Sequence, residues 1–193
     1  MKAGKTGAST KTPENIPFGA GTIHKNLKYT EGTGWNFDTS IVGATSGGSK
    51  LAIVPEIWRP DIDGVLVNAK GLTDKVGEKA SMDINLVELT PDIIKAAAFA
   101  KDGTSADANF DLIESKPHIE EGDYWENIAF VGKTLKGKDI IAILDNALCT
   151  SGFTHEGKNK EGAVGKYTFE CHAELESDLD TLPWHIYYPK ATA

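Results

Sequence analysis

The residue patterns in this chain that come nearest to known ligand-binding motifs are short and incomplete. Gly132-Lys133-Thr134 follows an apolar run, as in a phosphate-binding loop, but that motif needs a glycine where Asn127 stands. Gly19-Ala20-Gly21 lacks the third glycine of a dinucleotide-binding motif, because His24 occupies its position. We therefore interpret both segments as turns and predict no nucleotide cofactor.

Residues that could bind a metal or act as a nucleophile are few and irregularly spaced. Cys149, His155, Cys171 and His172 would meet only if their strands pair, and no Cys-x-x-Cys or His-x-x-x-His spacing is present. Cys171 shares the apolar positions of its segment, which favours a core residue over a metal ligand. The chain also has no Gly-x-Ser-x-Gly elbow and no His-Glu-x-x-His motif. We predict no catalytic residue, no metal and no enzyme, with a small enzyme of unassigned class as an alternative.

The four tryptophans leave a second alternative open. Exposed aromatic rings on a β-sandwich can stack on sugars, as in a carbohydrate-binding module. Trp35, Trp58, Trp125 and Trp184 are spread over a loop, a bend and two strands, so they predict no row of stacking rings. Core and interface roles are therefore favoured over sugar binding.

Length and charge narrow the class of protein. The chain has 193 residues, enough for one domain with a substantial core, and a net charge of −8. Five lysines and one glutamate give the first 30 residues +4, which leaves −12 for the other 163. Such an acidic body argues against binding of phosphate backbones. With two cysteines, no apolar run of membrane-spanning length and no apolar stretch at the start, we expect a reducing cytoplasm as the site of synthesis.

Hydrophobic periodicity predicts a mainly β fold, an antiparallel β-sandwich or barrel with one flanking α-helix. Residues 1–15 are predicted to be a flexible arm and residues 16–193 a single domain. The alternation of Met82, Ile84 and Leu86 predicts a strand over 81–88. Thr90-Pro91-Asp92 predicts the capped start of a helix that runs to residue 100. Further strands are expected over residues 22–30, 51–58, 64–67, 110–114, 124–131, 139–149, 167–176 and 184–188.

Residues 31–50 are predicted to form a long loop rich in Gly, Ser and Thr. Loops of this length in a compact domain are usually functional, and apolar side chains in them need a surface to contact. We predict that the apolar side chains of this loop, together with the lysines of the N-terminal arm, contact other subunits. These candidates are Trp35, Phe37, Ile41, Val42, Lys2, Lys5 and Lys11.

Three segments resemble the major tail (tail tube) proteins of long-tailed, non-contractile bacteriophages. They are Val54-Pro55-Glu56-Ile57, Met82-Asp83-Ile84-Asn85-Leu86 and Leu182-Pro183-Trp184-His185-Ile186-Tyr187, and the resemblance extends over nearly the whole chain. It implies a β-sandwich with a flanking helix, a fold shared by the tube proteins of type VI secretion systems. It also implies rings of six subunits, which join their inner sheets and stack into a tube for DNA ejection. The implied partners are other copies of the chain, a tape-measure protein and other tail proteins, and the implied location is the virion tail, assembled in the host cytoplasm.

An acidic lumen would repel DNA and let it slide, whereas a basic lumen would hold it. Asp83, Asn85, Glu170 and Glu174 occupy polar positions of the predicted strands, so we predict that they face the lumen. The alternative is that they face the solvent on the outside of the domain.

Overall fold

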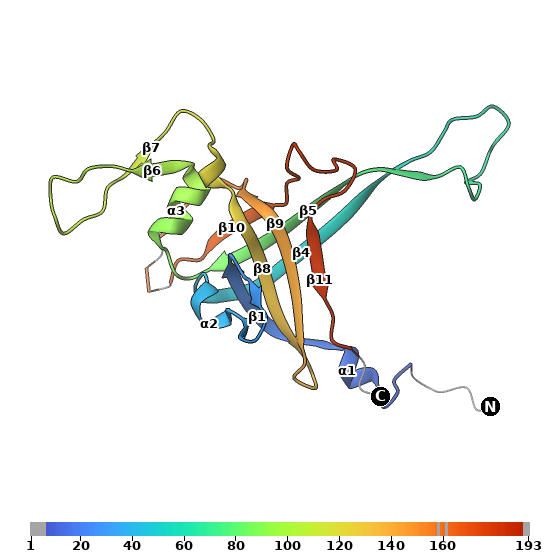
Figure 1. Ribbon diagram of the computed structural model, residues 1–193, viewed down its shortest axis with the longest axis horizontal. Coiled ribbons are helices and arrows are strands. Elements are labelled where there is room, and N and C mark those ends of the chain that lie inside the picture. The colour runs from blue at the N-terminus through green and yellow to red at the C-terminus, as the bar shows by residue number, and fades with distance from the viewer. Residues whose placement is uncertain (1–6, 158, 161, 191–193) are drawn as a thin grey trace.

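The structure, a computed structural model, describes residues 7–157, 159–160 and 162–190 (Figure 1). Strands make up 43% of the chain and helices 10%. Two antiparallel sheets pack face to face, and the longest helix lies at one end of them. The structure confirms the predicted fold class, a mainly β sandwich with a flanking helix.

The strand order separates the two sheets, which meet along one shared strand. The first sheet has the order β1-β8-β9-β11, with strands β1 (Pro17–Lys25), β8 (Trp125–Thr134), β9 (Asp139–Cys149) and β11 (Trp184–Tyr187). The second has the order β10-β5-β4, with strands β10 (Gly165–Glu170), β5 (Asp74–Leu86) and β4 (Thr45–Trp58). The end of β9 pairs with β10 at Cys149 and Phe169, so β9 joins the two sheets.

The main core lies between the sheets and follows from the period of two in β5. Met82, Ile84 and Leu86 are 0–2% exposed, and Phe169 on the neighbouring β10 is fully buried. The first sheet contributes further buried side chains, which are Ile23, Ile128, Leu144, Ala147 and Cys149. The predicted strand over 81–88 is confirmed, and β5 begins earlier than predicted, at Asp74.

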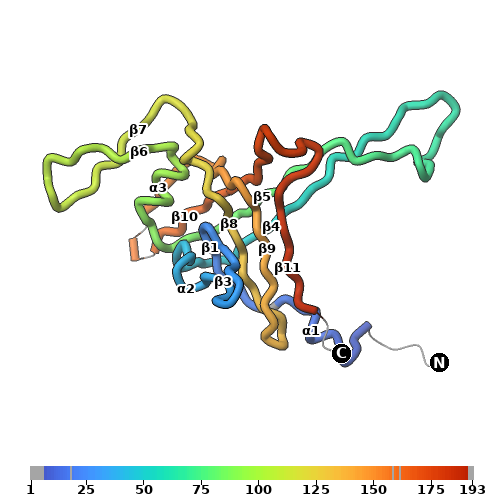
Figure 2. Tube along the Cα trace, in the orientation of Figure 1, coloured from blue at the N-terminus to red at the C-terminus, as the bar shows by residue number. Residues whose placement is uncertain are grey.

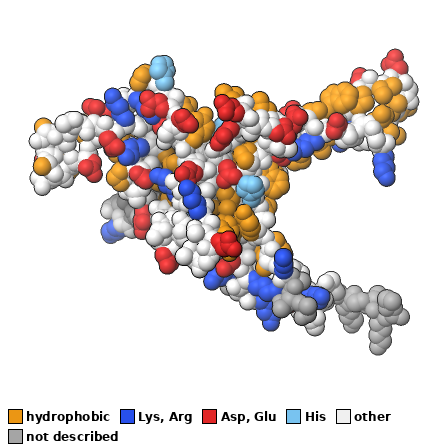
Figure 3. Space-filling model, in the orientation of Figure 1, with side chains coloured by type: hydrophobic (Ala, Val, Ile, Leu, Met, Phe, Trp, Pro, Cys, Tyr) orange, Lys and Arg blue, Asp and Glu red, His pale blue; other side chains and the backbone are white. Residues whose placement is uncertain are grey.

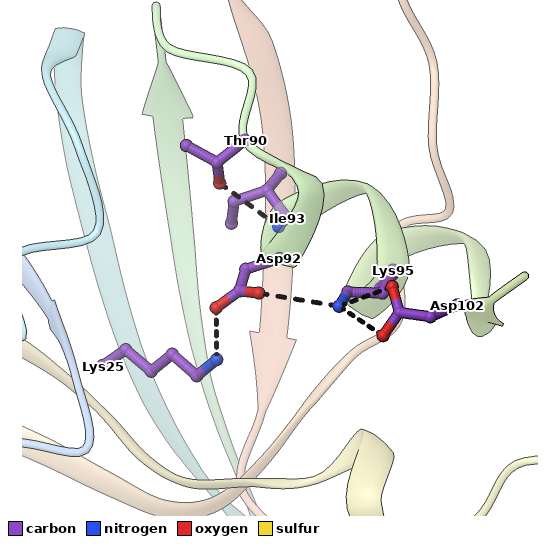
Figure 4. Close-up of polar contacts among 6 residues, drawn as sticks. All are labelled: Lys25, Thr90, Asp92, Ile93, Lys95 and Asp102. Carbon is purple, nitrogen blue, oxygen red and sulfur yellow. Dashed lines mark hydrogen bonds and ion pairs between the residues drawn. The ribbon is translucent and has the colours of Figure 1, made fainter. Parts of the chain in front are cut away.

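Helix α3 (Pro91–Ala98) closes one end of the core, as its sequence pattern predicts. The Thr90 hydroxyl caps it by accepting a hydrogen bond from the Ile93 amide at 3.4 Å. Asp92 in its first turn forms ion pairs with Lys25 of β1 at 2.8 Å and with Lys95 at 3.9 Å (Figure 4). The buried side chains of the helix, Ile93, Ala96 and Ala97, belong to the main core.

A second, smaller core covers the other face of the first sheet. Three short elements cover this face: β2 (Tyr29–Thr30), β3 (Gly34–Trp35) and α2 (Phe37–Ser40). Trp35 and Phe37 pack there against the buried residues Leu27, Ala129, Val131, Ile141 and Ile143. The prediction of one loop over 31–50 is therefore wrong in two respects, since it contains β3 and α2, and since β4 begins at Thr45.

Several predicted strands have different bounds in the structure. Residues 64–67 form no strand; they lie at the tip of a hairpin. Strand β7 (Ile113–Ser115) replaces the strand expected over 110–114, and it pairs with β6 (Ala100–Asp102), which the sequence pattern did not predict. A one-turn 3-10 helix, η1 (Glu121–Asp123), precedes β8. Helix α1 (Thr12–Asn15) lies within the N-terminal segment 1–15 that was predicted to be flexible, and residues 1–6 lie outside the described residues.

Both segments predicted to be turns lie in strands instead: Gly132-Lys133-Thr134 ends β8, and the glycines at 19 and 21 form part of a bulge in β1. The register of β1 against β8 shifts between Phe18 and Thr22, and Gly21 has a φ of 67°. A Cβ atom on Gly21 would collide with the Phe130 ring and the Val131 carbonyl oxygen. The bulge therefore requires glycine at this position.

Candidate assembly surface

The most prominent surface feature is a hairpin that extends away from the body of the molecule. Strands β4 and β5 continue beyond the sandwich, and residues 54–78, here called the arm, project from it (Figures 1 and 2). Strand pairing along the arm runs to Trp58 opposite Asp74. Residues 59–73 form the tip of the arm and contain no strand.

The arm is unusually apolar for an exposed hairpin. Nine of its apolar side chains are 37–94% exposed: Val54, Ile57, Trp58, Ile62, Val65, Leu66, Val67, Leu72 and Val76. Figure 3 shows hydrophobic side chains gathered on the projecting arm. A two-stranded hairpin is marginally stable on its own, and monomeric proteins rarely expose large contiguous apolar patches. These properties make the arm the candidate surface for contact with another protein.

A polar anchor fixes the root of the arm to the body. The Glu78 carboxylate accepts hydrogen bonds from the Leu182 amide at 3.1 Å and from the Trp184 indole at 3.3 Å, and it forms an ion pair with Lys75 at 2.7 Å. The hydrogen bond from Lys75, followed by those from Leu182 and Trp184, lowers the pKa of Glu78. The arm therefore leaves the body in a defined direction.

Three of the four residues predicted to face the lumen lie together on the outer face of the second sheet. Asp83, Asn85 and Glu170 alternate with core residues on paired strands β5 and β10. The Thr168 hydroxyl donates to Asp83 at 2.7 Å, and the Thr150 hydroxyl donates to Glu170 at 3.0 Å. The sequence pattern therefore identified one polar face that Asp83, Asn85 and Glu170 share.

The fourth residue, Glu174, lies elsewhere, which corrects the prediction for 167–176. Strand β10 ends at Glu170, and the chain then turns, with the Ser177 amide bonded to the Glu174 carbonyl at 3.0 Å.

The polar outer face of the second sheet also carries cations, because Lys50, Lys79 and Lys166 occupy outward positions on its three strands. Asp83 lies 4.0 Å from Lys50. This face is near charge balance, in contrast to the acidic wall that the sequence predicted.

The aromatic residues predicted to contact other subunits pack largely against side chains of the same chain. The Trp35 ring lies 5.0 Å from that of Tyr187 and 6.3 Å from that of Phe37, measured between centroids. Val42 packs against the main core, whereas Ile41 is 51% exposed. Ile41 is therefore the apolar candidate of this segment that has the most surface left for a partner. Among the lysine candidates, Lys11 is exposed beside α1, and Lys2 and Lys5 lie outside the described residues.

A buried histidine holds the segment that ends in Ile41 against the first sheet. His24 is 1% exposed, its Nδ1 lies 2.8 Å from the Ser40 hydroxyl, and its Nε2 lies 2.7 Å from the Thr22 hydroxyl. The Ser40 hydroxyl donates to the Asn36 carbonyl at 2.8 Å, so it can accept from an Nδ1–H of His24. In that tautomer Nε2 can accept from the Thr22 hydroxyl, which also lies 3.5 Å from the Val131 carbonyl oxygen. This arrangement satisfies the neutral ring, and burial lowers the pKa of His24.

We expect the folded state to lose stability as the pH falls below the ordinary histidine pKa of 6.5. In the unfolded chain His24 takes up a proton near that pH, but the folded chain resists protonation, so acid favours unfolding. Urea unfolding at pH 7.5 and pH 5 measures the effect, with His24→Gln as the control that cannot titrate. The two proteins should differ in pH dependence between these values, and equal pH dependence would contradict the assignment.

The other motif residues form no site for a metal or a row of sugar-stacking rings. Burial raises the pKa of Cys149, and it raises that of Cys171 to about 12. In the part of the chain that the structure describes, no group of three His, Cys, Asp or Glu side chains is placed to hold a metal. Trp125 is buried and Trp58 lies far away on the arm.

Comparison of the sequence with known proteins identifies no family to which the chain can be assigned. No protein-family model matches the chain, and no curated protein matches its sequence. No helix in the described ranges combines the length and the apolar character needed to cross a membrane. The candidate site therefore depends on the geometry of this chain.

The arm is the main candidate surface that the sequence analysis missed. Its signal is the apolar run Val65-Leu66-Val67 between the turn residues Asp63-Gly64 and Lys70-Gly71. The run predicts a short strand over residues 64–67, because an apolar run alone does not tell a paired strand from an exposed tip.

Proposed function

We propose that this chain is a structural, non-enzymatic subunit of a bacteriophage tail tube, which assembles into rings and stacks into a conduit for DNA. The observation that carries the proposal is the exposed apolar arm, which a second molecule must cover. The fold class agrees with the one implied by the resemblance to tail tube proteins.

Open sheet edges supply a second type of contact. Within the described residues, β4 pairs only with β5, and β11 pairs only with β9. An unpaired edge presents backbone donors and acceptors to another strand, and closure into a ring satisfies them without leaving a free edge. Rings of six subunits, as the resemblance implies, would form when the arm brings copies of the chain together and these edges then pair within the ring.

The polar outer face of the second sheet is the proposed wall of the conduit. On this face Asp83 accepts a hydrogen bond from the Thr168 hydroxyl, and Glu170 accepts one from the Thr150 hydroxyl. With a chain charge of −8, the assembled tube would repel DNA at a distance, while a near-balanced wall would not hold it. A tape-measure protein and other tail proteins are the proposed partners, and the virion tail is the proposed location.

Replacement of the arm tip tests the proposal. We expect the wild-type chain to form rings or hollow tubes in negative-stain electron microscopy at raised concentration. A variant in which residues 59–73 are replaced by Asn-Gly, a turn that favours a short hairpin, should fold and stay monomeric in size-exclusion chromatography. Deletion of residues 34–48 would be a poorer test, because it removes α2 and the start of β4.

The matched control is Leu175→Asp, since Leu175 is 91% exposed on the acidic segment after β10, outside the tip of the arm. This variant should assemble like the wild type. A wild-type chain that stays monomeric under all these conditions, or tubes of normal length from the arm replacement, would refute the proposed role.

A further inference from the structure

Three aromatic rings lie in contact over the outer face of the first sheet. The Trp35 ring lies 5.4 Å from that of Tyr29 and 5.0 Å from that of Tyr187, measured between centroids, and both contacts are edge-on. Trp35 is half-buried, whereas Tyr29 is 61% and Tyr187 is 51% exposed. These three residues, here called the aromatic strip, come from β2, β3 and β11. The fold therefore brings together rings that are far apart in the sequence.

Strand pairing holds the aromatic strip in place. Tyr29 and Trp35 are directly opposite each other in the β2–β3 pair, and Trp35 packs on the smaller core beneath it. Tyr187 pairs with Ile141 of β9, so its side chain lies on the same face of the sheet as that buried residue. Rings that are fixed before a ligand arrives lower the entropy cost of binding.

Polar groups border the aromatic strip on the same face. His185 precedes Tyr187 by two residues in β11, so both side chains point to one face. The His185 Nε2 lies 2.9 Å from the Asp145 carboxylate, and the His185 side chain is 53% exposed. Among the described residues, no hydrogen-bond partner is present for the hydroxyl groups of Tyr29 and Tyr187. Figure 3 shows a histidine and hydrophobic side chains side by side over β11.

Exposed rings with a polar border match the surface of a sugar. One side of a sugar ring carries C–H groups that stack on aromatic rings, and its rim carries hydroxyl groups that need hydrogen-bond partners. A stable protein interface takes about 800 Å² from each partner, more than three partly exposed rings supply. The bases of single-stranded nucleic acids also stack on aromatic rings, but the net charge of −8 repels their phosphates. A neutral carbohydrate is therefore the ligand that these observations favour.

We propose that the aromatic strip binds a neutral, β-linked carbohydrate chain. The three rings stack on the sugars, and His185 and Asp145 bind hydroxyl groups. Sugars with equatorial hydroxyl groups fit best, because their ring faces then expose C–H groups. The site needs neither the arm nor the open sheet edges, so it is a function beyond assembly. The strip and the proposed conduit wall lie on different sheets, so one subunit has room for both.

Titration of the wild-type chain with cellohexaose and chitohexaose, two neutral β-linked oligosaccharides, tests the inference. Isothermal titration calorimetry should detect binding of at least one of them. Tyr187→Ala should weaken the affinity about tenfold, because it removes one stacked ring. Tyr187→Phe keeps the ring and should retain most of the affinity. His185→Ala should also weaken binding, because it removes a hydroxyl-binding group from the border.

The matched control is Tyr188→Ala. Tyr188 is the next residue in the chain and 53% exposed, but its hydroxyl donates to Asn15 at 3.1 Å, away from the aromatic strip. This variant should bind like the wild type. Circular dichroism verifies that each variant is folded.

Several outcomes would overturn the carbohydrate site. One is the absence of binding by the wild type at millimolar concentrations of both oligosaccharides. Others are wild-type affinity in Tyr187→Ala and an equal loss in Tyr187→Ala and Tyr188→Ala. Binding of single-stranded oligothymidylate in place of the oligosaccharides would assign the rings to nucleotide bases instead. All these measurements use single molecules in solution, so they leave the proposed tail tube function to its own test.

Discussion

Replacement of Phe169 by alanine is expected to lower the free energy of unfolding by about 3–5 kcal/mol. Phe169 is fully buried on β10, where that strand pairs with both β5 and the end of β9. Its ring centroid lies 4.6 Å from that of Trp125, so it fills the space between the two sheets. Removing the ring leaves a cavity at the point where the sheets meet, and stability of a typical domain is only about 5–15 kcal/mol.

Urea unfolding followed by tryptophan fluorescence measures this loss. Thr168→Ala is the matched control on the opposite face of the same strand. It removes the hydrogen bond to Asp83 and should cost about 0.5–1.5 kcal/mol. If Phe169→Ala costs no more than this control, the assignment of Phe169 to the centre of the core is wrong.

The sequence predicted strands best where burial is complete on one or both faces. The bounds predicted for 139–149 are those of β9, which is apolar on both faces because its side chains reach two cores. Ile141 and Ile143 face the smaller core, whereas Leu144 and Cys149 face the main one. Two-sided burial gives a continuous apolar run whose ends mark the ends of the strand.

The sequence overestimates the length of a strand where polar and apolar side chains keep alternating after the strand pairing has ended. Residues 167–176 alternate throughout, yet pairing stops at Glu170, because the chain turns away to contact the root of the arm. Alternation reports which side chains are polar, but it does not report whether a partner strand is present. That is why Glu170 was placed correctly with Asp83 on one face and Glu174 was not.

The same limit applies to the candidate assembly surface. Trp35 and Phe37 looked like free apolar contacts in a loop, but they cover the outer face of the first sheet. Nine of the large apolar side chains that remain exposed lie on the arm, although the sequence pattern predicts ordinary strands there. Only the tertiary arrangement shows which hairpin extends beyond the body.

Charge reversal on the polar face should hinder DNA passage without preventing assembly. Asp83→Lys combined with Glu170→Lys replaces two carboxylates by two ammonium groups, which shifts the net charge of this face by +4 per subunit. If this face lines the conduit, the added cations bind DNA phosphates and slow ejection. Raised salt should restore much of the rate, because binding through phosphate contacts weakens steeply with salt.

The measurement is the rate of DNA release from assembled particles, with electron microscopy to verify normal tubes. Glu176→Lys combined with Asp178→Lys adds the same charge to the exposed segment after β10, away from this face, and should leave ejection unchanged. Normal ejection from the Asp83 and Glu170 variant would remove this face from the lumen. Slow ejection from both variants would instead attribute the effect to the overall charge of the tube.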